Sequence, residues 1–236
     1  MSNNKLQPKV SIIIPVFNGA AYLVEAVNSC LNQTYKNIEL VVVNDGSTDS
    51  TDTLMKFLVK KDSRIKYFTK ENTGLADTEN YGIERATGEI IARADADDIQ
   101  DHNKIQILVE ALEKSDFAYT GYFHGNIYGQ PWQEVHPGAF TLDNIRNNTC
   151  ASGCSFAYWK DRIPVKYRPE LRVNEDKAFL FDLFRYKKEH GLNYALVYIP
   201  TFNYRMLPTG MSYSRKKLVK KIDKLICKEI DDYEKS

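Results

Sequence analysis

The stretch IIARADADD (Ile90–Asp98) joins an apolar run to three carboxylates within four positions. Such a run is typical of a strand that is covered on both faces of a parallel sheet. Carboxylates this close repel one another, and each resists ionisation beside the others. Their oxygen atoms are the ligands that Mg²⁺ and Mn²⁺ prefer, and both ions commonly bridge to phosphate. We therefore predict that Asp95 and Asp97 hold a metal ion or a ligand. For Asp98 alone, the residue type favours a solvated turn that caps the next helix.

The bulk composition is that of a folded domain. The chain has 236 residues, of which 43% are hydrophobic and 27% charged, enough for one large α/β domain or a domain with an appendage. The formal net charge of +1 gives no support to nucleic-acid binding. Residues 1–9 lack the apolar segment of a secretion signal and no run is long enough to span a membrane, so we expect a cytoplasmic protein. Only Cys150 and Cys154 lie close together, and their C-x-x-x-C spacing without a nearby histidine makes a zinc site improbable.

Outward from Ile90–Asp98, the first hundred residues alternate between short apolar runs and helical patterns. We expect strands at 10–14, 38–43, 64–68 and 89–94, and helices at 20–33, 50–60, 75–86 and 102–114. Strands that alternate with helices of ten to fifteen residues indicate βαβ units and a parallel sheet with helices on both faces.

After Ser115 the sequence becomes rich in aromatic residues and less regular. We expect strands at 117–123, 126–132, 152–159 and 195–199, and helices at 141–147, 174–190 and 214–233. The last helix is amphipathic, with Leu218, Ile222, Leu225 and Ile226 on one face and six lysines elsewhere. It could lie on an anionic membrane surface or pack its apolar stripe on the domain, and the acidic residues that follow slightly favour packing.

Polar residues follow each of the four predicted parallel strands. These segments are Pro15–Gly19, Asn44–Asp49, Glu71–Gly74 and Asp95–Asp98. Because ligands bind beyond the carboxyl ends of the strands in an open parallel sheet, the topology brings all four to one site. There Asp45 could accept an N–H from a base edge or form a plain Asp-Gly turn. Gly74 could let backbone N–H groups approach an anion or serve as a simple turn.

Two common phosphate-binding motifs are absent from the sequence. No G-x-G-x-x-G follows the first strand, and no G-x-x-x-x-G-K-[ST] occurs anywhere. Dinucleotide-dependent dehydrogenases and P-loop nucleotide hydrolases are therefore disfavoured. A bound diphosphate would have to be neutralised by a metal ion on the carboxylates.

Taken together, these residues resemble the family 2 inverting glycosyltransferases, which have the GT-A fold. The matching segments are Ser11–Asn18, Val43–Asp49, Asn72–Gly74 and Arg93–Asp98, with weaker matches at Glu175-Asp176 and at Tyr204-Arg205 with Ser212. The resemblance implies a Rossmann-like, mainly parallel sheet flanked by helices, with a mixed-sheet acceptor half. It divides the chain into one catalytic domain at 1–213 and a C-terminal amphipathic helical tail at 214–236. The domain would comprise a nucleotide-sugar half at 9–100 and an acceptor half at 101–213.

The activity that the resemblance implies is transfer of a sugar from a nucleoside diphosphate, most often uridine diphosphate, to a glycan or lipid-linked hydroxyl with inversion. Asp97 and Asp95 would hold Mn²⁺ or Mg²⁺, and Asp176 matches the catalytic base. The residues implied in donor binding are Pro15, Phe17, Asn18, Asp45, Asn72, Gly74, Arg93, Asp95 and Arg205.

The residues alone leave alternatives open. An acidic pair at a helix start also complements the helix dipole, which would explain Asp176 equally well. Arg205 could contact the diphosphate or could be a surface ion-pair partner. The acceptor pocket is expected between about Tyr119 and Asp176, with aromatic side chains such as Trp132 that would equally suit a core and with the Cys150–Cys154 segment along its floor.

Two positions depart from the family pattern. Glu79 stands where the family often has arginine, and Leu207 stands where it often has histidine. These departures keep a second hypothesis open, a nucleotide-sugar-binding module with impaired catalysis. A third hypothesis is a sugar-nucleotide pyrophosphorylase, but Pro15–Asn18 does not resemble the glycine-rich, arginine-containing loop of that class.

Overall fold

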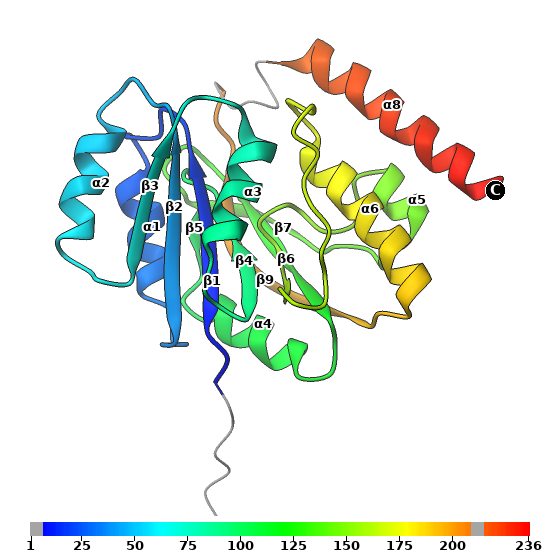
Figure 1. The fold of residues 1–236 in the computed structure, drawn as a ribbon, viewed down its shortest axis with the longest axis horizontal. Helices are drawn as coiled ribbons and strands as arrows, with labels where there is room; N and C mark the ends of the chain where they lie inside the picture. The colour runs from blue at the N-terminus through cyan, green and yellow to red at the C-terminus, as the bar shows by residue number, and fades with distance from the viewer. Residues whose placement is uncertain (1–6, 209–214) are drawn as a thin grey trace, which may run out of the picture.

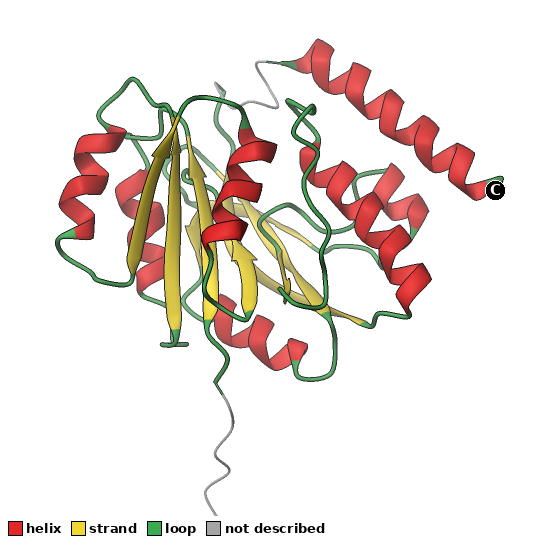
Figure 2. Cartoon of the chain, in the orientation of Figure 1, coloured by secondary structure: helices red, strands yellow, loops and turns green. Residues whose placement is uncertain are grey.

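The computed structural model describes residues 7–208 and 215–236 and forms one nine-stranded sheet covered by helices (Figures 1 and 2). The strands are β1 (Val10–Val16), β2 (Ile38–Asp45), β3 (Ile65–Lys70), β4 (Ile90–Arg93), β5 (Ile99–Gln100), β6 (Phe117–Gly125), β7 (Pro131–Val135), β8 (Phe156–Trp159) and β9 (Tyr194–Arg205). The helices are α1 (Leu23–Leu31), α2 (Thr51–Val59), α3 (Leu75–Arg85), α4 (Lys104–Leu112), α5 (Leu142–Arg146), α6 (Glu175–His190) and α8 (Lys216–Glu234).

The sheet is parallel in its first half and mixed in its second. Its order is β3-β2-β1-β4-β8-β6-β9-β5, and β7 pairs with β6. The first four strands run parallel, whereas β8 is antiparallel to both β4 and β6, and β5 is antiparallel to β9. This arrangement confirms the predicted mainly parallel sheet with a mixed second half.

Each face of the sheet has its own apolar core. One core joins β1, β2 and β4 to α1, α2 and α4 through side chains such as Ile12, Leu23 and Ile105. The other joins the opposite face to α3, α6 and α8 through side chains such as Ile13 and Phe179. Every residue of β1 and β2 is buried, as expected of strands with helices on both sides.

The C-terminal helix α8 packs on the domain. Ile226 and Ile230 are fully buried in the core that also contains α6, and Figure 1 shows α8 alongside α5 and α6. Side-chain ion pairs tie the helix down, among them Arg146–Asp231 at 3.1 Å, Arg168–Glu229 at 2.7 Å and Lys177–Asp223 at 2.6 Å. Leu225, which we expected on the apolar stripe, is instead 49% exposed.

Four features of the second half differ from expectation. Residues 152–155 form a loop, so the strand expected at 152–159 begins only at Phe156. Residues 126–130 form a turn rather than a strand, with Gly129 at φ 74°, and the strand begins only at Pro131. Strand β9 continues to Arg205 through register shifts near Pro200 that obscure its periodicity. Strand β5 has only two residues, too few to produce a pattern. In the described part of the chain, no helix has the length and apolarity that crossing a bilayer requires.

Candidate functional site

The loops that follow β1, β2 and β4 meet at one edge of the sheet. The Asn18 N–H donates to Ser47 Oγ at 2.9 Å, and Asn18 Oδ1 accepts from the Thr48 N–H at 2.8 Å. Asn18 adopts a left-handed conformation (φ 51°), which asparagine tolerates better than most residues. A Cβ at Gly19 would lie 3.6 Å from that of Ala96, so the β1 loop also touches the acidic turn after β4. Phe17 lies beside this junction and is 53% exposed.

The loop that follows β3 folds around Asp45 at the end of β2. Asp45 Oδ1 accepts from Lys70 Nζ at 2.6 Å and from the Thr73 N–H at 3.0 Å, while Oδ2 accepts from the Gly74 N–H at 3.0 Å. The Asn72 side chain donates to the Asp45 carbonyl at 2.8 Å. Burial alone would raise the pKa of Asp45, but Lys70 and the backbone donors outweigh it and lower that pKa. The Gly74 N–H thus binds an anion, as one alternative expected, but that anion is the Asp45 carboxylate.

The backbone conformation at position 74 also requires glycine. Its φ is +102°, in the region that side chains rarely adopt, and a Cβ there would lie 2.5 Å from Arg172 Nη1. That guanidinium donates to the Thr73 carbonyl at 2.6 Å. Arg172 therefore closes the loop over the glycine.

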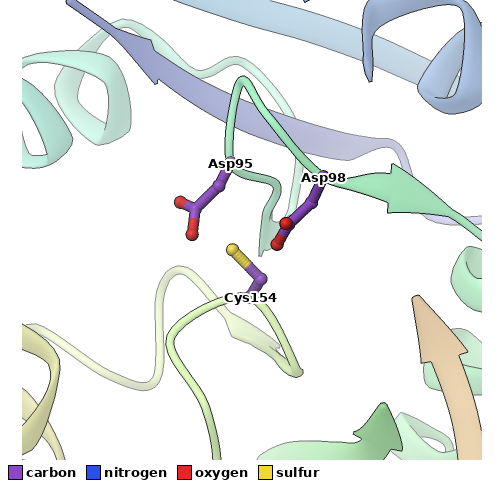
Figure 3. Close-up of side chains that lie close together, drawn as sticks. All are labelled: Asp95, Asp98 and Cys154. Carbon is purple, nitrogen blue, oxygen red and sulfur yellow. The ribbon is translucent and has the colours of Figure 1, made fainter. Parts of the chain in front are cut away.

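Asp98 is the buried residue of the acidic turn after β4, which corrects its prediction, while Asp95 and Asp97 are half-buried. Asp98 is only 1% exposed, and its Oδ1 accepts from the Arg205 N–H at 2.8 Å. It does not cap the next helix, because α4 begins at Lys104 with Asn103 at its N-cap. Asp98 lies near Asp95 and Cys154, with one ligand atom of each residue within 4.8 Å of the others (Figure 3).

Electrostatics show that this turn is short of positive charge. Burial and the neighbouring charge of Asp95 raise the pKa of Asp97 to about 6. Burial and the charges of Asp95 and Asp97 raise the pKa of Asp98 well above its ordinary value. A divalent cation among these oxygen atoms would favour the ionised carboxylates, so the residues present fit Mn²⁺ or Mg²⁺.

Arg93 lies behind the turn and is paired with the unexpected glutamate. Its Nε is 2.6 Å from Glu79 Oε1, and the two side chains are 3% and 0% exposed. Neither atom is aligned well enough for a hydrogen bond, so the contact is an ion pair by distance only. Arg93 Nη2 also lies 3.3 Å from Asp95 Oδ1, and the guanidinium faces the Tyr167 ring at 5.4 Å.

Asp176, at the start of α6, faces the same site. A Cβ at Gly153 would lie 2.5 Å from Arg93 Nη1 and 3.4 Å from Asp176 Cβ, so Gly153 separates the two side chains. Burial and the charges of Asp176 and Asp98 together raise the pKa of Tyr122. The Asp176 Oδ1 atom accepts from the Lys177 N–H at 2.8 Å. The structure therefore brings the predicted base to the acidic turn.

Arg205 is an ion-pair partner, as one alternative expected, but it is buried rather than on the surface. It is 5% exposed, and its Nη2 pairs with Glu25 Oε2 at 2.7 Å. The guanidinium also lies 4.6 Å from the Tyr22 ring. A diphosphate would have to compete with Glu25 for this side chain.

The sequence did not single out Tyr122 or predict the pairing of Glu79 with Arg93, because both come together only through tertiary contacts. Arg93 and the Cys150–Cys154 segment were expected at the site and do lie there. Trp132 is 59% exposed, with its ring 5.5 Å from His124, whereas Trp159 donates to the Leu112 carbonyl against the domain. The weak match at Ser212 lies outside the described residues.

Comparison with known proteins identifies the class. The family model described as glycosyl transferase family 2 matches residues 11–181, more than half of the chain. The chain belongs to glycosyl transferase family 2, as the resemblance implied. An uncharacterized glycosyltransferase of Rickettsia bellii is 40% identical over 135 residues, which are 56% of this chain and 19% of that protein. The chain therefore spans only part of this relative.

Solved structures confirm the GT-A fold. Staphylococcus aureus TarS 1-349 in complex with UDP-GlcNAc has a TM-score of 0.73 at 20% identity, with 92% of this chain and 65% of that chain covered. The mannosyltransferase PcManGT of Pyrobaculum calidifontis in complex with GDP-Man and Mn²⁺ has a TM-score of 0.65 at 17% identity, with 92% and 61% covered. At such identities the likeness establishes the fold.

Proposed function

We propose that this chain transfers a sugar from a nucleoside diphosphate sugar to a hydroxyl group of a glycan or lipid-linked acceptor, with inversion at the anomeric carbon. The observation that carries the proposal is the position of Asp176 across Gly153 from Arg93, beside the acidic turn. Inverting transfer needs one group to take the acceptor proton and another to stabilise the departing diphosphate. The acidic turn and Asp176 supply carboxylates for both tasks within one site.

Uridine is the base that we favour, through Asp45. Its Oδ2 accepts from the Gly74 N–H, and a carboxylate oxygen can accept a further hydrogen bond from the N–H of a base edge. Lys70 and Thr73 hold Oδ1 and fix the orientation of the carboxylate. Pro15, Phe17 and Asn18 would flank the nucleoside on the β1 side, and Asn72 supports the opposite loop. Structural neighbours solved in complex with UDP, UDP-GlcNAc and GDP-Man support a nucleotide-sugar donor.

Asp97 and Asp95 would hold Mn²⁺ or Mg²⁺ at the diphosphate. The ion, when bound, supplies a Lewis acid that neutralises charge on the leaving group. Arg93 holds Asp95 from behind at 3.3 Å, and Arg205 would reach the diphosphate only on release from Glu25.

Asp176 would act as the base that takes the acceptor hydroxyl proton. The Lys177 N–H holds Oδ1, and Oδ2 makes no further hydrogen bond among the described residues. A carboxylate fixed in this way can accept the proton as the acceptor oxygen attacks, a contribution of roughly 10² to 10⁴ in rate.

For a lipid-linked acceptor, the exposed lysines of α8 would supply the membrane contact. Its apolar stripe is packed on the domain at Ile226 and Ile230, so the contact would be electrostatic rather than inserted. The exposed lysines are Lys216, Lys217, Lys220, Lys221, Lys224 and Lys228.

The test of the base is Asp176→Asn. A thermal-shift screen of UDP-, GDP-, dTDP- and CMP-sugars with Mn²⁺ first identifies the donor. We then expect the variant to bind that donor normally and to lose at least about 100-fold in transfer rate. Asp232→Asn, an exposed change on α8, is the matched control and keeps full activity. Full transfer by Asp176→Asn would remove Asp176 from the mechanism.

The test of the metal site is Asp97→Ala. We expect it to abolish the Mn²⁺-dependent part of UDP binding in calorimetry, and unchanged affinity would contradict the assignment. A chain that binds the donor but never releases the nucleotide would instead support a binding module with impaired catalysis. The family match favours transfer over the pyrophosphorylase alternative.

A further inference from the structure

Cys154 places a sulfur atom on the inner side of the acidic turn. Its Sγ, one oxygen of Asp95 and one oxygen of Asp98 all lie within 4.8 Å of one another, and Figure 3 shows the three side chains gathered there. Cys154 and Asp98 are each 1% exposed. This group is a mixed oxygen and sulfur donor set, which differs from the oxygen-only set that Mg²⁺ prefers.

One atom of this group lacks a partner. Asp98 Oδ1 accepts from the Arg205 N–H, but Oδ2 is buried without a hydrogen bond from any described residue. Leaving a buried acceptor unsatisfied costs about 1–3 kcal/mol or more for a charged group. An ion bound in this position would explain the unpaired oxygen.

The backbone of Cys154 is held in place, whereas the Asp95 side chain can adjust. The Cys154 carbonyl accepts from Lys104 Nζ at 2.7 Å, and the same ammonium reaches the Arg93 carbonyl and Gln100 Oε1. The Asp95 side chain is 31% exposed and is held at 3.3 Å by Arg93. A small movement of Asp95 would therefore bring all three donors onto one ion.

The local charges favour a divalent cation. Lys104 and Arg93 are the nearby positive groups. Two carboxylates and a thiolate exceed their two positive charges by one, and the adjacent Asp97 carboxylate adds a second negative charge to the excess. A divalent ion balances that excess.

We propose that Asp95, Asp98 and Cys154 bind a thiophilic divalent ion of the zinc class inside the turn, at a position that shares Asp95 with the proposed Mn²⁺ or Mg²⁺ site but does not use Asp97. Zinc commonly takes three protein ligands from Cys, His and carboxylate groups and leaves a fourth position open. On binding, the Cys154 S–H bond breaks, the sulfur donates its electron pair to the ion and the proton passes to solvent. The C-x-x-x-C pair is not the site, because Cys150 is turned to Tyr119 instead.

The test is a Cd²⁺ titration of the metal-free chain of residues 1–236, followed by the ultraviolet charge-transfer absorption of a cadmium–thiolate bond. Cys227 is partly exposed, so Cys227→Ser is the parent for all variants. We expect one equivalent of Cd²⁺ to bind with this absorption and Zn²⁺ to displace it. Cys150→Ser, which removes a buried thiol of the same loop, keeps the signal, and so does Asp97→Asn. Cys154→Ser loses the signal.

Asp98→Asn keeps the thiol and serves as a second test of the site if Cys154→Ser does not fold. We expect it to weaken Cd²⁺ binding by at least about tenfold. Absence of the cadmium–thiolate absorption in the parent, or unchanged binding in Asp98→Asn, would overturn the proposal. No nucleotide is present in this titration, so its failure would leave the proposed transfer reaction untouched.

Discussion

Glu79 and Arg93 form an ion pair that is closed to solvent, directly behind the acidic turn. Burial raises the pKa of Glu79 to about 8, although the Arg93 charge opposes this shift. The arginine that the family often has at position 79 is therefore replaced by an acid whose side chain packs against the buried guanidinium of Arg93 on β4. Arg93 also contacts Asp95, so the departure that argued for impaired activity keeps a cationic group beside the acidic turn.

Arg93→Met tests this pair at the residue scale. Removing one partner leaves Glu79 buried without its counter-charge, and we expect the free energy of unfolding to fall by about 3–5 kcal/mol. The double variant with Glu79→Leu should recover much of that loss, because both charges are then absent. Urea unfolding of the two single variants and the double variant measures the coupling.

The matched control for Arg93→Met is Arg162→Met. Arg162 pairs with Asp116 at 3.0 Å, but its side chain is 47% exposed. An exposed pair contributes at most about 1 kcal/mol, so we expect a small change. Strictly additive effects in the Glu79 and Arg93 variants would show that the pair does not act as a unit.

At the scale of elements, α8 differs from a free amphipathic tail because its apolar stripe lies in the core. We expect Ile226→Ala to lower the free energy of unfolding by about 2–5 kcal/mol, since a fully buried side chain leaves a cavity. Leu225→Ala, on the adjacent exposed position, should change it by about 0.5 kcal/mol or less. Equal effects of the two changes in thermal unfolding would mean that α8 does not stay docked in solution.

The elements that the sequence predicted well are those with a simple period. Strands β1, β2 and β4 contain nearly continuous apolar runs, and the predicted bounds of these strands and of β3 agree with the observed bounds within a few residues. The turn at 126–130 was taken for a strand because its aromatic residues suit strands, while Gly129 and Pro131 set the actual boundary. Strand β9 was only half predicted, since its register shifts break the alternation.

At the scale of the whole molecule, some features of the candidate site could be predicted from the sequence and others could not. Convergence of the four strand ends follows from parallel topology, so those loops could be placed together in advance. The burial of Asp98 and the contacts of Arg205 could not, because they depend on β9 and α1, which lie far away in the sequence. Cys154 reaches the turn for a similar reason, through the loop before β8.

The acidic site also sets how the stability of the metal-free molecule depends on pH. Burial raises the pKa of Asp97 to about 6, of Glu175 to about 7 and of Glu79 to about 8. Acids with raised pKa bind more protons in the folded state than in the unfolded state, so their stabilisation is lost as pH rises through these values. The pKa of Glu39 is shifted in the opposite direction. Burial would raise its pKa, but Lys9, Ser11 and Thr87 lower it to about 2, so its stabilisation is lost only on acidification.

We therefore expect the free energy of unfolding of the metal-free chain to be greatest near the ordinary glutamate pKa of 4.5 and to fall toward pH 8. A pKa that differs by one between the folded and unfolded states corresponds to about 1.4 kcal/mol, so the fall should amount to several kcal/mol. Mn²⁺ binds ionised carboxylates and should stabilise the chain more at the alkaline end than at the acid end. Urea unfolding across this range, with and without Mn²⁺, measures both effects.

Asp97→Asn is the control that removes one of the three titrations and should flatten the metal-free profile. A stability that rises from pH 4.5 to 8 without metal would mean that these carboxylates are already neutralised by partners of the protein itself.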